Sequence, residues 1–105
     1  MSKWITVVFA LMLLLSHSNL SHAVNGNELL DTAEHPRFTY ISGVADYIFV
    51  QVGLGEEQRI CFPKGVTYAQ LQKVALKYLE DHPAELHITA AALIYNAFND
   101  AFRCR

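Results

Sequence analysis

Apolar residues recur every three or four positions in three stretches of the chain, which is the spacing of an amphipathic helix. These stretches cover residues 38–51, 67–81 and 89–101. Thr67 is placed to cap the second stretch, with Gln70 completing a capping box, and Thr89 is placed to cap the third. Each stretch is therefore predicted to be a helix.

A shorter helix is expected ahead of these three. Asn25 or Asn27 is placed to cap it, and Glu28 in its first turn suits the helix dipole. His35-Pro36 is expected to end it, because the residue before a proline avoids the helical region. The prediction is an all-α fold, a small bundle of about four helices with a structured central loop.

The stretch 38–51 is apolar on most of its circumference, so we expect the central buried helix or a helix that meets a second subunit. Gly43 is expected on its apolar side, where it would permit close helix approach. Asp46 is interpreted as a surface carboxylate or one bonded to a neighbouring helix terminus, and a functional acid is the alternative. Residues 47–52 would also suit a strand, but the helical spacing continues into them. The inward face is predicted to contain Ile41, Val44, Ala45, Ile48 and Val52.

The N-terminus has the pattern of a secretory leader. Lys3 precedes an apolar run of about a dozen residues, and Ser21-His22-Ala23 offers small residues where a signal peptidase acts. The run is shorter than the roughly 20 residues that span a bilayer. Residues 1–23 are predicted to be a signal peptide cleaved near Ala23, and residues 24–105 to be one soluble, secreted domain.

The chain contains two cysteines, Cys61 in the central loop and Cys104 beside the last residue. Pro63 and Gly65 prevent a helix from running through this loop. Because a secreted chain with an even cysteine count matures in an oxidising compartment, we expect a disulfide between Cys61 and Cys104. It would tie the end of the chain to its middle. The alternative is two separate buried thiols.

Charge excludes some classes of partner. Removing Lys3 with the leader leaves seven basic against ten acidic residues, a net charge of about −3. A mildly acidic chain without a basic cluster is a poor candidate for nucleic acid or for an anionic membrane.

Catalytic and metal-binding patterns are scarce. Ser42 is the one serine outside the leader, and no phosphate-binding or dinucleotide fingerprint occurs. A Cys61 nucleophile with His82 or His87 as its base would be silenced by the disulfide. The spacing of His35, His82 and His87 is not that of a zinc site. We therefore expect no enzyme, no cofactor and no metal.

Binding is the function class that remains. The polar loop 53–59 is the first candidate contact surface and the loop 81–87 the second, while the alternative for both is a solvated connection. The candidate partner-binding residues are Glu56, Glu57, Gln58, Arg59, His82 and Glu85.

Five motifs in register resemble the Rap/Tai family of immunity proteins, and they cover nearly all of the chain after the leader. They are Gly26-Asn27-Glu28-Leu29-Leu30, Tyr40-Ile41-Ser42-Gly43-Val44-Ala45-Asp46, Ile60-Cys61-Phe62-Pro63-Lys64-Gly65-Val66-Thr67, Tyr78-Leu79-Glu80-Asp81-His82-Pro83 and Ala101-Phe102-Arg103-Cys104.

The resemblance implies a periplasmic helical protein that neutralises a peptidoglycan amidase effector delivered by type VI secretion. It further implies a papain-like cysteine amidase as the target, an inhibitor that covers its substrate cleft, and a homodimer that presents the contact loops. A papain-like site pairs a thiolate with an imidazolium, so we expect Glu56 or Glu57 to place a carboxylate near that cation.

The chain departs from this family at a second cysteine pair, which members commonly carry and which would link the first two helices. Ala33 stands at about the first of these positions, and no cysteine occurs between Arg37 and Thr39. The first helix is therefore expected to lack a covalent tie to the second.

The strongest alternative is a periplasmic stress or chaperone-like helical protein, which the chain resembles in size, leader and single disulfide. Such a protein would expose apolar surface in acid and bind many clients, whereas this chain has few acidic residues to titrate. A structural adaptor of the cell envelope is a third interpretation.

Overall fold

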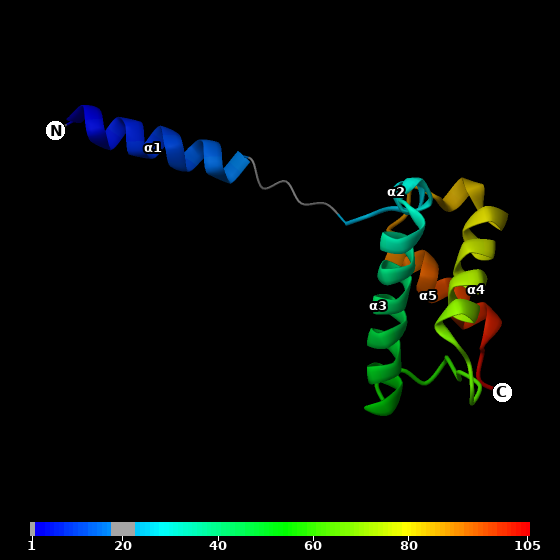
Figure 1. Cartoon of the computed structure of the whole chain (residues 1–105). Helices are drawn as coiled ribbons and strands as arrows, with labels where there is room; N and C mark the ends of the chain where they lie inside the picture. Colours follow the sequence, from blue (N-terminus) through cyan, green and yellow to red (C-terminus); the bar gives the residue numbers. More distant parts are fainter. Residues whose placement is uncertain (1, 18–22) are drawn as a thin grey trace.

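The computed structural model describes residues 2–17 and 23–105, which form helices joined by loops (Figure 1). Across these residues the backbone contains two isolated β-bridges and no β-strand. The predicted all-α fold is confirmed. Its α-helices are α1 (Ser2–His17), α2 (Gly26–Asp31), α3 (Glu34–Gly53), α4 (Tyr68–Asp81) and α5 (Ala90–Ala101), with the 3-10 helix η1 (Pro83–Glu85) between α4 and α5.

Helix α1 coincides with the apolar run that was predicted to be a leader. None of the helices in the described part of the chain is long and apolar enough to cross a membrane. Ser21 and His22 of the predicted cleavage site lie outside the described residues. The signal peptide therefore stays a prediction.

Helix α5 is the centre of the bundle, since it packs against α2, α3 and α4. Among the described residues, its Phe98 is the largest fully buried side chain, at 0% exposure. Helices α3 and α4 also pack on each other and run in opposite directions (Figure 1). Residues 54–67 therefore lie at one end of the bundle and residues 82–89 at the other. The buried core also includes Leu29, Ile41, Ala45, Ile48, Ile60, Leu71, Ala75, Leu79, Leu93 and Ile94.

The predicted helix caps are largely confirmed. The Glu28 backbone N–H donates to Asn25 Oδ1 at 2.9 Å, and the Gln70 N–H donates to Thr67 Oγ1 at 3.1 Å. Each bond satisfies a backbone donor that has no partner within its helix. Thr89 is the cap residue of α5, but its side chain makes no capping bond.

The boundary between α2 and α3 differs from the prediction. Helix α2 ends at Asp31, because Thr32 is extended at ψ 144°, and His35-Pro36 lies in the first turn of α3. Proline is tolerated there because the first backbone N–H groups of a helix have no intrahelical partner anyway. The expectation that His35-Pro36 ends the helix now labelled α2 was wrong. The helix predicted over residues 38–51, now labelled α3, begins at Glu34.

Helix α3 continues through residues 47–52, so the strand alternative was wrong. Gly43 does not pack against a helix, since a Cβ built on it would meet nothing within 4 Å, and Val52 is 36% exposed. Both were expected on the buried side. Asp46 is exposed and accepts a hydrogen bond from the Tyr68 hydroxyl at the start of α4. This confirms its interpretation as a surface carboxylate bonded to a neighbouring helix terminus.

The end of the chain is tied to its middle, as predicted. Cys61 and Cys104 form a disulfide, with a Cα–Cα distance of 4.9 Å. The Cys61 N–H donates to the Phe102 carbonyl at 2.7 Å, and the Cys104 N–H donates to the Arg59 carbonyl at 3.0 Å. Phe62 then packs its ring against Phe98, with ring centroids 5.7 Å apart. The central loop is thus fixed covalently, by backbone hydrogen bonds and by an aromatic anchor in the core.

Helix α2 is held without a disulfide. The Gly26 N–H donates to the Ile88 carbonyl at 3.1 Å, and the Ala90 N–H donates to the Val24 carbonyl at 2.7 Å. A Cβ on Gly26 would lie 2.8 Å from Leu93 Cδ1 and 2.9 Å from Leu86 Cδ2. Only glycine lets α2 approach the start of α5 this closely.

Candidate functional site

The loop after α3, residues 54–59, has a defined backbone. Gly55 has φ +75°, a conformation that glycine adopts without strain. With this backbone conformation, the Gly55 N–H donates to the Val52 carbonyl at 3.1 Å, and the Glu56 N–H donates to the Gln51 carbonyl at 2.9 Å. This is the Schellman pattern of helix termination, which uses the last carbonyl groups of α3.

Glu57 fastens this loop to α5. Its Oε1 accepts the Arg59 backbone N–H at 2.7 Å, and its Oε2 accepts the Tyr95 hydroxyl at 2.8 Å. These two donors hold the pKa of Glu57 below its ordinary value of 4.5. The Arg59 guanidinium adds an ion pair at 3.6 Å and lies 5.5 Å from the centre of the Tyr95 ring. We call this Glu57–Arg59–Tyr95 cluster the loop brace.

The other loop residues face solvent. The Glu57 side chain is only 12% exposed, whereas that of Arg59 is 73% exposed. Gln58 is exposed and donates to the Gly55 carbonyl at 3.3 Å. The Glu56 side chain is exposed, and its carboxylate makes no hydrogen bond or ion pair with the described residues. Among the residues predicted in this loop, Glu57 is thus largely buried, whereas the side chains of Glu56, Gln58 and Arg59 are exposed.

Apolar side chains continue this surface along α3. Tyr47, Val50 and Leu54 are 65%, 56% and 69% exposed, and their spacing places them on one side of the helix. We call these residues the outer stripe. Outside α1, the other exposed large hydrophobic residues in the described part of the chain are Val52, also on α3, and Tyr68, which is bonded to Asp46 of α3. Exposed apolar surface of this kind is typical of an interaction site.

The second predicted loop lies at the opposite end of the bundle, so the two candidate loops do not form one site (Figure 1). His82 Nδ1 donates to the Tyr78 carbonyl oxygen at 2.7 Å, and the two rings stack with centroids 3.9 Å apart. Glu85 accepts a 3.4 Å hydrogen bond from the Tyr78 hydroxyl. Burial, followed by the charge of Glu85, raises the pKa of Tyr78. Both predicted residues are half-buried and bonded within the molecule.

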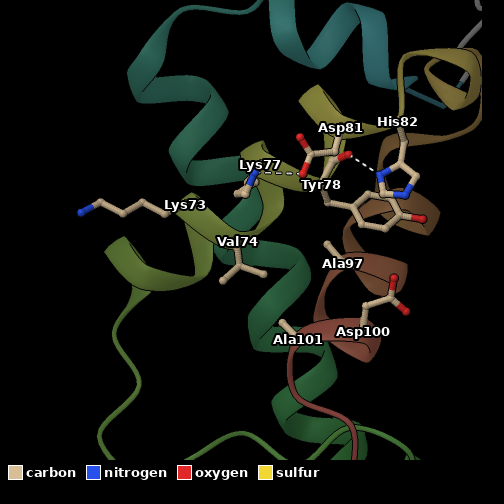
Figure 2. A pocket seen from close by; sticks show the side chains of 9 residues that line it. All are labelled: Lys73, Val74, Lys77, Tyr78, Asp81, His82, Ala97, Asp100 and Ala101. Carbon is tan, nitrogen blue, oxygen red and sulfur yellow. Dashed lines mark hydrogen bonds and ion pairs between the residues drawn. The ribbon is translucent and has the colours of Figure 1, made fainter.

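A groove of about 440 Å³ lies along the surface where α4 meets α5, beside this second loop (Figure 2). Val74, Ala97 and Ala101 contribute its apolar lining, and Lys77 forms a 3.0 Å ion pair with Asp81 at its edge. In Figure 2 the Lys73 side chain extends away from the groove.

Among the described residues there is neither a free thiol nor a cluster that could hold a metal ion. Cys61 and Cys104 are both in the disulfide, which removes the one candidate nucleophile. In the described part of the chain, no three His, Cys, Asp or Glu side chains lie close enough together to hold a metal ion.

Sequence reasoning did not identify Tyr95 or the outer stripe as parts of the site. Tyr95 is 38 residues from Glu57, and nothing in the local pattern pairs them. Tyr47 and Val50 did carry a signal, because they make the stretch 38–51 apolar outside its predicted buried face.

One comparison with known proteins identifies a family. A family model described as Rap1a immunity proteins matches residues 20–104, nearly the full chain. Neither a curated protein nor a solved structure gave a significant match.

Proposed function

Because the chain belongs to the family of Rap1a immunity proteins, which are non-catalytic inhibitors of cognate type VI secretion effectors, we propose that it inhibits a peptidoglycan amidase effector by covering its active-site cleft. Family membership supports inhibition of a cognate effector, and the expectation of a protein without enzymatic activity agrees with it. The disulfide indicates an extracytoplasmic location, and the proposed compartment is the periplasm.

The loop brace is the observation that supports the covering of the cleft. It fastens loop 54–59 to α5 while Glu56 and Gln58 remain exposed, and the guanidinium of Arg59, although part of the brace, is also largely exposed. A loop that is already ordered loses less conformational entropy on binding than a flexible one, which favours affinity. The loop is also joined to the disulfide, which limits its movement away from the bundle.

Inhibition is proposed to be steric and electrostatic. In a papain-like amidase the catalytic thiolate is paired with an imidazolium, and a carboxylate placed near that cation would be attracted to it. Glu56 is the better candidate for this contact, because its carboxylate has no partner among the described residues whereas that of Glu57 is engaged in the loop brace.

The test of this surface is the triple variant Glu56→Ala, Gln58→Ala, Arg59→Ala, which retains Glu57. We expect the complex with the amidase to dissociate at least about tenfold faster, because interface truncations act mainly on dissociation. The control is Lys73→Ala, Glu80→Ala, which removes one charge of each sign from exposed positions on α4. Equal inhibition by the triple variant and the control would place the contact surface elsewhere.

The family resemblance also implies a homodimer, and the outer stripe supports this part of the proposal. Gly43 has open space above it on the same side of α3, so a second helix could approach the backbone there. We expect a concentration-dependent dimer by sedimentation equilibrium and its loss in Val50→Glu. A wild-type protein that remains monomeric at high micromolar concentration would contradict the dimer.

His82 and Glu85 stay predicted contact residues. Since they lie at the far end of the bundle from loop 54–59, one small cleft would not contact both regions of a single subunit. The family match favours the immunity interpretation over the stress-protein alternative.

A further inference from the structure

A second, smaller cavity adjoins the loop brace. It has a volume of about 210 Å³ and lies where one side of α3 meets α5. Val44, Ile48 and Gln51 are spaced four and three residues apart on α3, and Ala91 and Tyr95 are four apart on α5, so each set projects from one helix side. We call it the brace pocket, and its lining comprises Val44, Tyr47, Ile48, Gln51, Glu57, Ala91 and Tyr95.

The brace pocket combines apolar walls with one negative charge. Two tyrosines, Tyr47 and Tyr95, belong to its lining together with three aliphatic residues. Glu57 contributes the carboxylate, and Gln51 contributes an amide. Aromatic rings attract cations through their electron-rich faces, and a carboxylate attracts them more strongly. The lining therefore matches a positively charged group carried on an apolar stem.

Glu57 retains capacity for another donor. A carboxylate can accept about four hydrogen bonds. In Glu57, Oε1 accepts the Arg59 backbone N–H and is paired with the Arg59 guanidinium at 3.6 Å, whereas Oε2 accepts only the Tyr95 hydroxyl among the described residues. A purely apolar occupant would displace water from the carboxylate without replacing the lost hydrogen bonds, which is unfavourable. A cationic occupant would supply the missing donor, and an anionic one would be repelled.

The brace pocket is continuous with the surface proposed to meet the effector. Glu57 belongs both to its lining and to loop 54–59, the loop proposed to contact the effector. A partner that covers loop 54–59 is therefore close enough to place a side chain in the pocket. Well-packed pockets of this kind are where interface affinity concentrates.

We propose that the brace pocket receives a lysine or arginine side chain of the amidase effector, with its methylene stem against Tyr47 and Tyr95 and its charge at Glu57. The identity of the partner rests on the proposed function, but the preference of the pocket for a cationic side chain does not. The pocket is then a specificity determinant that selects effectors with a basic residue beside the covered cleft.

The first experiment measures the pocket without any effector. Oxidised protein, residues 24–105, is titrated with N-acetyl-lysine methylamide and, separately, with N-acetyl-norleucine methylamide, which has the apolar stem but no charge. We expect saturable amide shifts at Gln51 and Ala91 by NMR with the lysine probe, and binding at least about fivefold weaker with norleucine. Equal affinity for the two probes, or no shift with either, would overturn the proposal.

Two variants localise the effect. Ala91→Phe places a ring in the pocket from an exposed position on α5, and Ala92→Phe places the same ring on the exposed neighbour that does not line it. The lysine shifts should disappear in Ala91→Phe and persist in Ala92→Phe. In Glu57→Gln the preference for lysine over norleucine should be lost.

The effector arm uses the same pair of variants in an assay of peptidoglycan cleavage. We expect Ala91→Phe to inhibit at least about tenfold more weakly than Ala92→Phe. Equal inhibition by the two variants would show that the brace pocket lies outside the effector interface. A change of oligomeric state in Ala91→Phe alone would show that the pocket belongs to a dimer interface. Either result would overturn the proposal. If the wild-type protein inhibits no amidase while the lysine probe still binds, the proposed function fails and the cation preference stands.

Discussion

Removal of the disulfide should cost this domain a large part of its stability. Cys61 and Cys104 are separated by 43 positions, so the bond closes a loop of about 44 residues. In the chain-entropy treatment, releasing such a loop in the unfolded state lowers the free energy of unfolding by about 4 kcal/mol. Small domains are typically stable by about 5–15 kcal/mol, so this loss is substantial.

The perturbation is the double variant Cys61→Ser, Cys104→Ser. Cys61 is exposed and Cys104 half-buried, so the serine hydroxyls should not add a large burial penalty. The backbone bonds from Cys61 to Phe102 and from Cys104 to Arg59 do not need the sulfur atoms, and the folded structure should persist. For a domain of this size, a loss of about 4 kcal/mol corresponds to a melting temperature lower by about 15–30 °C.

Urea denaturation of the oxidised wild type and the double variant, followed by circular dichroism at 222 nm, measures the difference. The account predicts a lower midpoint and a slightly larger m-value, because the unfolded chain without the bond exposes more surface. A difference in unfolding free energy below about 1 kcal/mol, with unchanged m-values, would refute the loop-entropy reasoning.

Three further predictions concern single residues. Gly26→Ala should destabilise the domain by about 1–3 kcal/mol through overpacking. Gly43→Ala, in open space within α3, should instead stabilise the domain by about 0.5–1 kcal/mol. Urea titrations of both variants measure this contrast. Asn25→Ala should destabilise by about 1 kcal/mol through loss of the α2 cap, with Asn25→Asp as the matched control that retains an acceptor. Because the pKa of folded Glu57 lies below 4.5, its contribution to stability should be complete above pH 4.5 and be lost as the pH falls through the folded-state pKa. In Tyr95→Phe that pKa should rise toward 4.5, as measured by NMR titration of the Glu57 carboxyl carbon, and an unchanged pKa would contradict the loop brace.

Features determined by nearby residues could be predicted from the sequence. Thr67 caps α4 and Asn25 caps α2 because a cap needs only a side-chain oxygen and a backbone N–H three residues later. The disulfide followed from the cysteine count and the leader. The error at His35-Pro36 has a local cause as well, since proline disfavours the middle of a helix but is tolerated in its first turn.

Features that depend on packing could not be predicted in the same way. The stretch 38–51 is apolar on most sides, so its pattern did not show which side faces the core, and Gly43 was assigned to the wrong one. The role of Glu57 depends on Tyr95, which reaches it only because α5 packs beside the end of α3. The sequence therefore indicated loop 54–59 as a candidate contact surface but did not distinguish the residue that fastens this loop from those that remain exposed.

The most direct test of the account is inhibition of peptidoglycan cleavage. Oxidised protein, residues 24–105, is titrated into purified papain-like type VI effector amidases, with muropeptide release as the measured rate and bovine serum albumin as the matched protein control. The account predicts that at least one amidase forms a stable complex with the protein and loses its activity at a stoichiometric ratio. Full cleavage activity of all the amidases at saturating protein, without a detectable complex, would contradict it.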